Sequence, residues 1–444
     1  MKAVMFMFGL LFFNVGFKMS RYRFSGLIFT VGILSLIPIG MNGMTFEDYH
    51  MYTIRPETLG QLKILHKVKE TAGFDFWDVP KMHRASRVMV KRIDARVFEK
   101  FLKRYGIYYE QAEKNVQQIL DQEKLKIRQR RYKRSIGLDY TVTFKHYWSL
   151  EEIYEYIEYL GSFHPMVNSI TIGNTHEQRS IKAVTISLDG QITMKRPVVF
   201  IDAGIHAREW AGIMAVMYMI HEFAENTRWY GEQLNNTDYV IIPVLNPDGF
   251  VYSREVNRLW RKNRVRLHSE CVGVDLNRNF PYAWVNSGTM CKPYFAGSRP
   301  GSELETRAMM NLMERFKAAV KLYIAVHTHG EMILWPWGYK VVRCDNWREH
   351  DHYAKMASNA IKTAGGKQWR VGNSAELMYI ASGASDDYAH ANGVRLAYTI
   401  ELTGGGQYGF DLPEEELGKA LAQTMQIFKV FGKVAGRSLN STFP

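Results

Sequence analysis

Four runs of apolar residues, each long enough for a buried strand, alternate with amphipathic stretches over the last two thirds of the chain. The runs are rich in β-branched residues and predict strands at Val198–Ile205, Tyr239–Leu245, Val320–Val326 and Val394–Ile400. The stretches beside them have helical spacing and cover Trp210–Glu225, Ser302–Phe316, His352–Ala364 and Pro413–Val434. This alternation predicts an α/β fold in which helices cover both faces of a mixed sheet.

Two capping boxes add helix starts to this pattern. Ser149 is followed three residues later by Glu152, and the pair predicts the start of a helix that ends before Pro165. The second pair, Ser302 and Glu305, predicts the start of the helix that runs to Phe316.

Shorter elements precede this region, between Thr45 and about Leu125. Strands are expected at Tyr49–Arg55 and Ser86–Ile93, and helices at Glu57–Glu70 and Arg96–Tyr105. The segment Lys124–Arg134 then places seven basic residues in eleven positions. Such a run is either a solvated helix end or an exposed linker that a trypsin-like or furin-like protease can cut.

The first forty residues contain two apolar stretches, Ala3–Phe17 and Leu27–Ile39, with a basic segment between them. The second stretch has the length of a signal peptide's apolar region and ends in small residues, which predicts secretion. Met19 is an alternative start that would leave the first stretch untranslated. A membrane anchor is the competing interpretation, but each stretch is short for a span of about 20 apolar residues.

The net charge of +13 lies in the amino-terminal third of the chain. Residues 1–134 contain 25 Lys and Arg against 12 Asp and Glu, and residues 135–444 contain 32 of each sign. The large carboxyl-terminal part therefore lacks the basic excess of nucleic-acid-binding proteins, and we expect no nucleic-acid partner.

The chain has three cysteines. Cys271 and Cys291 flank a loop and could form a disulfide that leaves Cys344 unpaired, as a secreted protein allows. Three unrelated buried thiols remain an alternative. Sequons at Asn235 and Asn440 are compatible with secretion.

The tetrapeptide His206-Ala-Arg-Glu209 follows the first predicted strand of the large domain. A histidine and a carboxylate at this position could share one Zn²⁺, and a catalytic zinc site needs a third protein ligand. Polar residues also lie at the ends of the other strands: Asn246-Pro-Asp-Gly249, His327 and Glu401. Since strand ends of an α/β sheet gather ligands and chemistry, a shared site is expected there.

Other catalytic signatures are absent from the sequence. It contains no His-Glu-x-x-His zinc helix, no Gly-x-Ser-x-Gly nucleophile elbow and no Walker loop.

Six motifs together resemble the zinc metallocarboxypeptidases of the pancreatic A/B type. They are His206-Ala-Arg-Glu209, Asn246-Pro-Asp-Gly-Phe250, Asn257-Arg-Leu-Trp-Arg-Lys262, Asp275-Leu-Asn-Arg-Asn279, His327 and Thr399-Ile-Glu401-Leu. The resemblance covers roughly residues 140–435, and residues 45–125, with Phe74-Asp-Phe-Trp77, resemble the inhibitory pro-domain of that family. It implies a carboxypeptidase fold with a mixed, eight-stranded type of sheet, preceded by a small α+β, ferredoxin-like pro-domain.

The resemblance divides the chain into four parts. Residues 1–43 would be the signal segment, 45–123 the pro-domain, 124–134 the cleavage linker, and 135–440 the zinc-binding catalytic domain. The expected partners are the carboxyl termini of peptides or proteins, the activating protease, and the chain's own pro-domain as inhibitor.

The same resemblance assigns roles to individual residues. His206, Glu209 and His327 would hold one Zn²⁺, as in the His₂Glu sites of this family. Glu401 would be the general base, and Arg261 would stabilise the oxyanion that forms. Asn277 and Arg278 would bind the terminal carboxylate of the substrate, Tyr379 would close over it, and Arg208 would contact the peptide. Asp275 would orient His206.

Some of these positions have alternatives. His329 lies two residues after His327, and spacing does not choose between them as ligand, whereas the family pattern selects His327 and has an aromatic residue at the position of His329. The basic residues from Arg258 to Arg264 could form only a solvated stretch.

Specificity is expected to depend on Asp386. In the resemblance this residue lies where B-type enzymes carry an acid at the base of the pocket for the terminal side chain. A buried carboxylate is stabilised by a cation, which favours release of a carboxyl-terminal Lys or Arg. Ser374 on the pocket wall agrees with this. The competing interpretation is that Asp386 is a loop acid bound to the local backbone, with Asp387 as its paired structural acid. The alternatives are A-type specificity for aromatic or aliphatic termini and a non-catalytic peptide-binding relative.

Overall fold

The computed structural model describes residues 48–68, 74–77, 80–111, 117, 142–268, 271–286, 289–406 and 409–437. The chain divides into two units, Met1–Gly43 and Met44–Pro444, of which the first lies outside the described residues. The expected signal segment, the basic linker 124–134 and Asn440 therefore also fall outside them.

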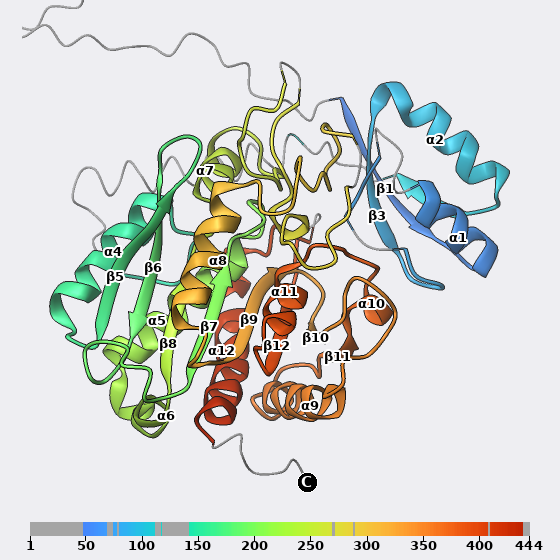
Figure 1. Cartoon of the computed structure of the whole chain (residues 1–444). Helices are drawn as coiled ribbons and strands as arrows, with labels where there is room; N and C mark the ends of the chain where they lie inside the picture. The colour runs from blue at the N-terminus through green and yellow to red at the C-terminus, as the bar shows by residue number, and fades with distance from the viewer. Residues whose placement is uncertain are drawn as a thin grey trace, which may run out of the picture. The chain divides into compact units, whose positions relative to one another are not determined.

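Residues 142–437, without the gaps given above, contain a sheet of eight strands in the order β11-β10-β12-β9-β7-β8-β6-β5 (Figure 1). Its strands are β5 (Val167–Asn174), β6 (Ser180–Ile186), β7 (Val198–Ala203), β8 (Asp238–Ile242), β9 (Val320–Thr328), β10 (Met332–Trp335), β11 (Arg370–Asn373) and β12 (Leu396–Leu402). The central strands β12, β9, β7 and β8 are parallel, and all their positions except Lys321 are buried, as in sheets covered on both faces.

The parallel strands bring the predicted chemistry to one edge of the sheet. Glu401 of β12 is in register with His327 of β9. His206 comes three residues after the end of β7, which is the other neighbour of β9. The chain leaves β7 toward β8 on one side and returns as β9 on the other, so the carboxyl ends of β7 and β9 flank a topological switch point, where α/β sheets bind ligands.

Helices cover both faces of this sheet. One apolar core contains buried residues of α4 (Leu150–Phe163), α5 (Trp210–Glu225), α9 (Trp347–Thr363) and α12 (Glu414–Gly436). A second core, on the other face, contains residues of α8 (Leu304–Phe316) and α11 (Ser385–Ala391). Shorter helices are η1 (Thr227–Trp229), α6 (Gly231–Asn236), α7 (Pro247–Glu255), η2 (Leu276–Arg278) and α10 (Ser374–Leu377). The predicted fold class is thus confirmed.

The described part of residues 48–111 forms a small α+β domain. Its antiparallel sheet has the order β2-β3-β1-β4, with β1 (Tyr49–Arg55), β2 (Phe74–Phe76), β3 (Ser86–Lys91) and β4 (Tyr108–Gln111). The helices α1 (Leu59–Val68) and α2 (Arg92–Arg104) contribute Leu65, Phe98 and Leu102 to the core shared with this sheet.

Two local predictions are wrong. Helix α8 has Glu303 as its N-cap residue and no side-chain cap, because Ser302 Oγ donates to Glu303 Oε1 and accepts from Asn279 Nδ2. The capping box Ser302–Glu305 therefore does not form. Helix α2 begins at Arg92 rather than Arg96, since Ile93 is not the end of a strand but an exposed helical residue. The capping box of Ser149 and Glu152 is confirmed.

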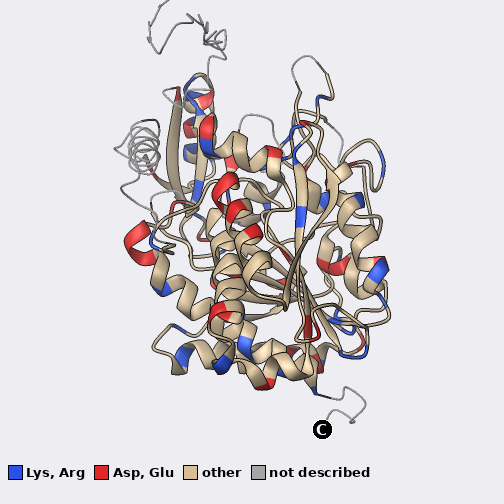
Figure 2. Cartoon of the chain, turned by 90° about the vertical axis from the view of Figure 1, so that its left-hand side faces the viewer, with Lys and Arg blue, Asp and Glu red and all other residues tan. Residues whose placement is uncertain are grey.

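Cys271 and Cys291 form a disulfide, and Cys344 is a buried free thiol. Among the described residues, no helix is long and apolar enough to cross a membrane. Figure 2 shows Lys and Arg interspersed with Asp and Glu over the helices, in line with the balanced charge of residues 135–444.

Candidate active site

The turn from β7 into α5 carries the first two candidate ligands. Gly204 begins the turn with a φ of 65°, and a Cβ there would lie 3.0 Å from Ile213 side-chain atoms, so glycine is required. Glu209 is the N-cap residue of α5, and its carboxylate lies at the positive end of the helix dipole. His206 and Glu209 are both 4% exposed.

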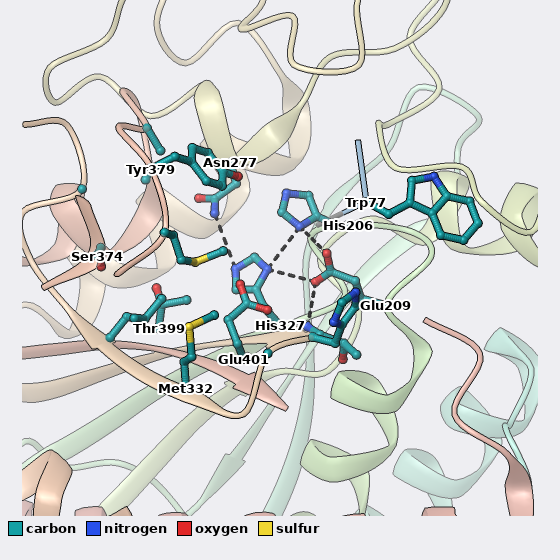
Figure 3. Close-up of a pocket in the computed structure, with 18 of the residues that line it drawn as sticks. Trp77, His206, Glu209, Asn277, His327, Met332, Ser374, Tyr379, Thr399 and Glu401 are labelled. Carbon is teal, nitrogen blue, oxygen red and sulfur yellow. Dashed lines mark hydrogen bonds and ion pairs between the residues drawn. The ribbon is translucent and has the colours of Figure 1, made fainter. Parts of the chain in front are cut away.

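His206, Glu209 and His327 bring their side chains to one point (Figure 3). His206 Nδ1 lies 2.8 Å from Glu209 Oε1, and His327 Nδ1 lies 3.1 Å from His206 Nδ1 and 3.0 Å from Glu209 Oε2. Two imidazole nitrogens that face each other need a shared proton or a cation. The donor set of two nitrogens and one carboxylate is that of a catalytic zinc site, so these residues fit Zn²⁺.

The pKa shifts of His206 and Glu209 agree with metal ligation, whereas Glu209 and Glu401 raise the pKa of His327 to about 9 against the effect of burial. Burial, reinforced by the charge of Arg261, lowers the pKa of His206 and favours the neutral imidazole. Burial opposes ionisation of Glu209, but the adjacent His206 and His327 hold its pKa well below the ordinary value. His206 also has an acceptor for its second ring nitrogen, because Nε2 lies 3.3 Å from Asp275 Oδ1.

Arg261 and Glu401 line the same pocket as these three residues. Arg261 donates from Nε and Nη2 to Asp275 Oδ2 at 3.0 and 2.9 Å, which fixes its guanidinium beside Glu209. Burial, together with the charge of Glu209, raises the pKa of Glu401 to about 8. A carboxyl group with a pKa near neutrality can both accept and return a proton.

Asn277, Arg278 and Tyr379 form another wall of the pocket. Arg278 Nη2 donates to Tyr379 Oη at 2.9 Å, and Asn277 Oδ1 accepts from the backbone N–H of Ser385 at 2.9 Å. Since α11 begins at Ser385, this bond ties η2 to the segment that carries Asp386.

Asp386 is 4% exposed and lines the pocket together with Ser374 and Thr399. Its Oδ2 accepts hydrogen bonds from Thr399 Oγ1 at 3.0 Å and Ser374 Oγ at 3.4 Å. In the described part of the chain no Lys, Arg or His forms an ion pair with it. Asp387 instead accepts from the backbone N–H groups of Gly338 and Tyr339, and burial next to Asp386 raises its pKa to about 8.

Residues of the amino-terminal domain complete the pocket. Sequence reasoning expected this domain to be inhibitory but did not identify which of its residues line the pocket. Phe76, Trp77, Lys81, Arg84 and Ala85 line it together with the residues above, and its cavity has a volume of about 240 Å³. The sequence signal that could have identified them is the aromatic segment Phe74–Trp77.

Arg208 is one point where the two domains meet. Its Nη1 lies 3.5 Å from Asp75 Oδ2, and its guanidinium lies 4.3 Å from the centre of the Phe410 ring. Trp77 packs edge-on against the same ring, at 6.0 Å between centroids. Lys81 Nζ donates to the carbonyl oxygen of Leu377.

Of the other residues that sequence reasoning singled out, His329 lines the pocket and the rest lie elsewhere. Asn246 caps α7, and Asp248 binds Thr175 and Arg179, so neither belongs to the pocket. The Arg258 guanidinium lies 3.6 Å from the Trp210 ring centre and is buried rather than solvated. His329 lines the pocket and packs on Phe410 at 4.9 Å, and it is His327 that lies with His206 and Glu209.

Comparison with known proteins agrees with this geometry. Residues 153–427 match the family model described as "Zinc carboxypeptidase", and residues 52–123 match "Carboxypeptidase activation peptide". The chain is 34% identical to carboxypeptidase B of Astacus astacus over 291 residues, which cover 64% of this chain and 95% of that protein. It is 32% identical to carboxypeptidase A2 of Mus musculus over 387 residues, covering 84% and 90% of the two chains.

A solved structure is similar as well. The carboxypeptidase A from Helicoverpa armigera matches with a TM-score of 0.82 and 28% identity, covering 89% of this chain and 99% of that one. The chain thus belongs to the zinc carboxypeptidases that carry an activation peptide. It is a metallocarboxypeptidase with Zn²⁺ as its cofactor, made as a zymogen. Relatives of both A and B type are similar to it, so their names do not define its specificity.

Proposed function

We propose that this zinc carboxypeptidase releases Lys or Arg from the carboxyl termini of peptides and proteins. The observation that carries the proposal is the buried carboxylate of Asp386, which lines the pocket. It accepts from two hydroxyl groups and from the backbone N–H of Asp387, and it has no cationic partner among the described residues. A lysine or arginine side chain of a substrate would supply that cation. Asp387 does not compete for it, because two backbone N–H groups occupy its oxygens.

The residues around the metal ligands suit hydrolysis of the last peptide bond. When bound, Zn²⁺ polarises a carbonyl group and lowers the pKa of a water molecule. In our proposal Glu401 accepts the proton of the attacking water and returns it to the leaving amine, for which its raised pKa is suited. Arg261 stabilises the oxyanion, and its contacts with Asp275 hold it in place before the reaction.

The terminal carboxylate of the substrate is the feature that makes the enzyme an exopeptidase. Arg278 offers a guanidinium that matches a carboxylate, Asn277 adds an amide donor, and Tyr379, already bound to Arg278, would close over the terminus. Arg208 would contact the peptide once Asp75 has left.

The activation peptide inhibits the uncut enzyme in this proposal. Trp77 and Asp75 contact Phe410 and Arg208, so the amino-terminal domain covers groups that a substrate would need. A trypsin-like or furin-like protease would cut within residues 124–134 and release it. We also propose residues 1–43 as a secretion signal and 135–440 as the secreted catalytic domain.

The specificity proposal is tested by replacing Asp386 with isoleucine in the activated enzyme. The wild type is expected to release Arg and Lys faster than Phe and Leu, and Asp386→Ile should reverse this order because the pocket loses its charge. Asp351→Asn, a charge removal on α9 away from the pocket, serves as the control and should leave the order unchanged. If Asp386→Ile keeps the wild-type order, Asp386 does not set the specificity.

A further inference from the structure

A second group of potential metal ligands lies outside the active site. It consists of His176, Glu303 and Glu305, which we call the His176 cluster. His176 lies in the turn between β5 and β6, and the two glutamates lie at the start of α8. Asn263, two residues after Arg261, reaches the same place from a third segment of the chain.

The distances within the His176 cluster suit a single ion. His176 Nε2 lies 3.5 Å from Glu303 Oε2, and one ligand atom from each of the three residues lies within 4.8 Å of the others. Two ligands of a tetrahedral zinc ion, each bound at about 2.0–2.1 Å, are about 3.4 Å apart. In the group His206, Glu209 and His327 of the active site the corresponding separations are shorter, at 2.8–3.1 Å.

Of the two buried glutamates of the cluster, Glu305 has too few partners for a carboxylate, whereas Glu303 also accepts from Ser302 Oγ. Glu303 and Glu305 are 3% and 0% exposed, and Asn263 Nδ2 donates to both, at 2.7 and 3.2 Å. Glu305 Oε1 is buried and has no hydrogen-bond partner among the residues that the structure describes. Burial, with the charge of Glu303, raises the pKa of Glu305 to about 7. A buried acceptor without a donor is costly, and a cation at this point would satisfy it.

We propose that the His176 cluster binds a second divalent metal ion, of the zinc type, through one imidazole nitrogen and two carboxylates. This ligand set suits zinc better than Ca²⁺ or Mg²⁺, which take six or more oxygen ligands or keep several waters. The side chain of His176 is 31% exposed, so the ion has access from solvent and room for a water ligand. The ion joins the β5–β6 turn, the segment after Arg261 and the start of α8.

The competing interpretation is an ion pair between a protonated His176 and Glu303, without a metal. The neighbours favour His176 protonation, since its pKa is raised by the hydrogen bond to Glu303, against burial, with further help from Glu305 and Asp248. The two interpretations predict different numbers of bound metal ions per chain. The active-site ligands bind one ion in either case, and only the metal interpretation adds a second.

The test uses the full-length proenzyme after its metal has been removed with a chelator and the chelator by dialysis. The protein is then titrated with ZnCl₂. Mass spectrometry measures the number of bound metal ions, and calorimetry measures the heat of binding. We expect two zinc ions per chain for the wild type and one for His176→Gln and for Glu305→Gln. His352→Gln, which removes an exposed histidine of α9, should keep two. Titration with CaCl₂ or MgCl₂ should show no binding at this site.

Thermal unfolding gives a second readout that does not depend on activity. The second equivalent of zinc should raise the Tm of the wild type but not of His176→Gln, because an ion that binds only the folded state stabilises it. His176 is partly exposed, so its variant remains informative even if Glu305→Gln fails to fold. One zinc ion per wild-type chain, or two in His176→Gln, would overturn the proposal.

Discussion

Asp275 connects the candidate metal ligands with the candidate substrate-binding residues. Its Oδ1 faces His206 and accepts from the backbone N–H of Asn277 at 3.0 Å, and its Oδ2 accepts from Arg261. The charges of Arg261 and Arg278 hold its pKa well below the ordinary value, although burial opposes this. One carboxylate therefore orients a candidate ligand, the candidate oxyanion-binding group and the turn that carries Asn277.

The sequence predicted the identities of these residues better than their contacts. The motifs indicated His206, Glu209, His327 and Glu401 because side chains at the ends of parallel strands converge. The bond between Asp275 and Arg261 could not be predicted, since it depends on how the loop after α7 folds back on η2.

Replacing Glu401 with glutamine tests the general base. Glutamine keeps the shape but cannot accept the proton, so kcat should fall by about 10²–10⁴-fold. Zinc content and Tm should stay at wild-type values, and Glu376→Gln, on α10, is the matched control with normal kcat. Activity within a factor of about three of the wild type would show that another group takes the proton.

The buried side chain of His350 is expected to make the free energy of unfolding depend on pH. It is fully buried, its Nε2 accepts from the N–H of Ala397 at 3.1 Å, and Nδ1 lies 3.2 Å from the carbonyl oxygen of Asn346. Burial, with the charge of His390, lowers its pKa to about 3. The unfolded chain therefore binds a proton between pH 6.5 and 3 where the folded chain does not, and stability falls as the pH falls through this window.

The size of this effect is about 1.4 kcal/mol for each unit of pKa shift, as an upper bound for one group. His350→Gln should flatten the dependence of the urea midpoint on pH between 7 and 4, because glutamine does not titrate. His352→Gln, on the same helix but exposed, should follow the wild-type curve. Equal slopes for His350→Gln and the wild type would rule out this origin of acid sensitivity.

The helices and strands of the large domain lie where the apolar pattern predicts them, but several of their ends differ from the prediction. The strand run Val198–Ile205 ends at Ala203, because the turn with Gly204 must begin there to place His206. The predicted start of α8 is wrong because Ser302 Oγ accepts a hydrogen bond from Asn279, a residue distant in sequence, and does not cap the helix. Element cores depend on local periodicity, whereas element ends depend on tertiary partners.

The turn before α11 shows how one backbone position supports the site. Gly383 has a φ of 68°, and a Cβ there would lie 2.3 Å from the carbonyl oxygen of Arg278. Gly383→Ala should displace Arg278 and raise KM for peptides with a free terminal carboxylate, with a loss of about 1–3 kcal/mol in stability. Steady-state kinetics on matched peptides measure the change.

Gly365→Ala is the control that separates backbone strain at a positive φ from displacement of a neighbouring residue. Gly365 also has a positive φ, of 83°, but a Cβ there meets nothing within 4 Å. Its variant should lose stability and keep the wild-type KM. A normal KM for Gly383→Ala would mean that Arg278 is not held by this turn.

At the scale of the whole molecule, the proposed inhibition of the uncut enzyme depends on the contact between the two domains. Trp77 is 6% exposed and packs with Leu259 and Phe410 of the large domain. Trp77→Ala removes a large buried contact, worth about 3–5 kcal/mol in protein cores, and should weaken the docking of the amino-terminal domain. The uncut variant should therefore hydrolyse peptides faster than the uncut wild type.

Cleavage provides the internal control for that variant. After the activation peptide has been cut and removed, Trp77→Ala and the wild type have the same catalytic domain and should have the same kcat/KM. If the uncut variant is as inactive as the uncut wild type, the contact of Trp77 does not contribute to inhibition.

The most direct measurement compares initial rates on peptides that differ only in their last residue. The protein is activated with trypsin, the trypsin is inhibited, and release of the last residue is followed by mass spectrometry. We predict that terminal Arg and Lys leave faster than Phe and Leu by about tenfold or more, as pocket contacts allow, and that a chelator abolishes all release until zinc is restored. Faster release of Phe or Leu, or release that survives the chelator, would contradict the account.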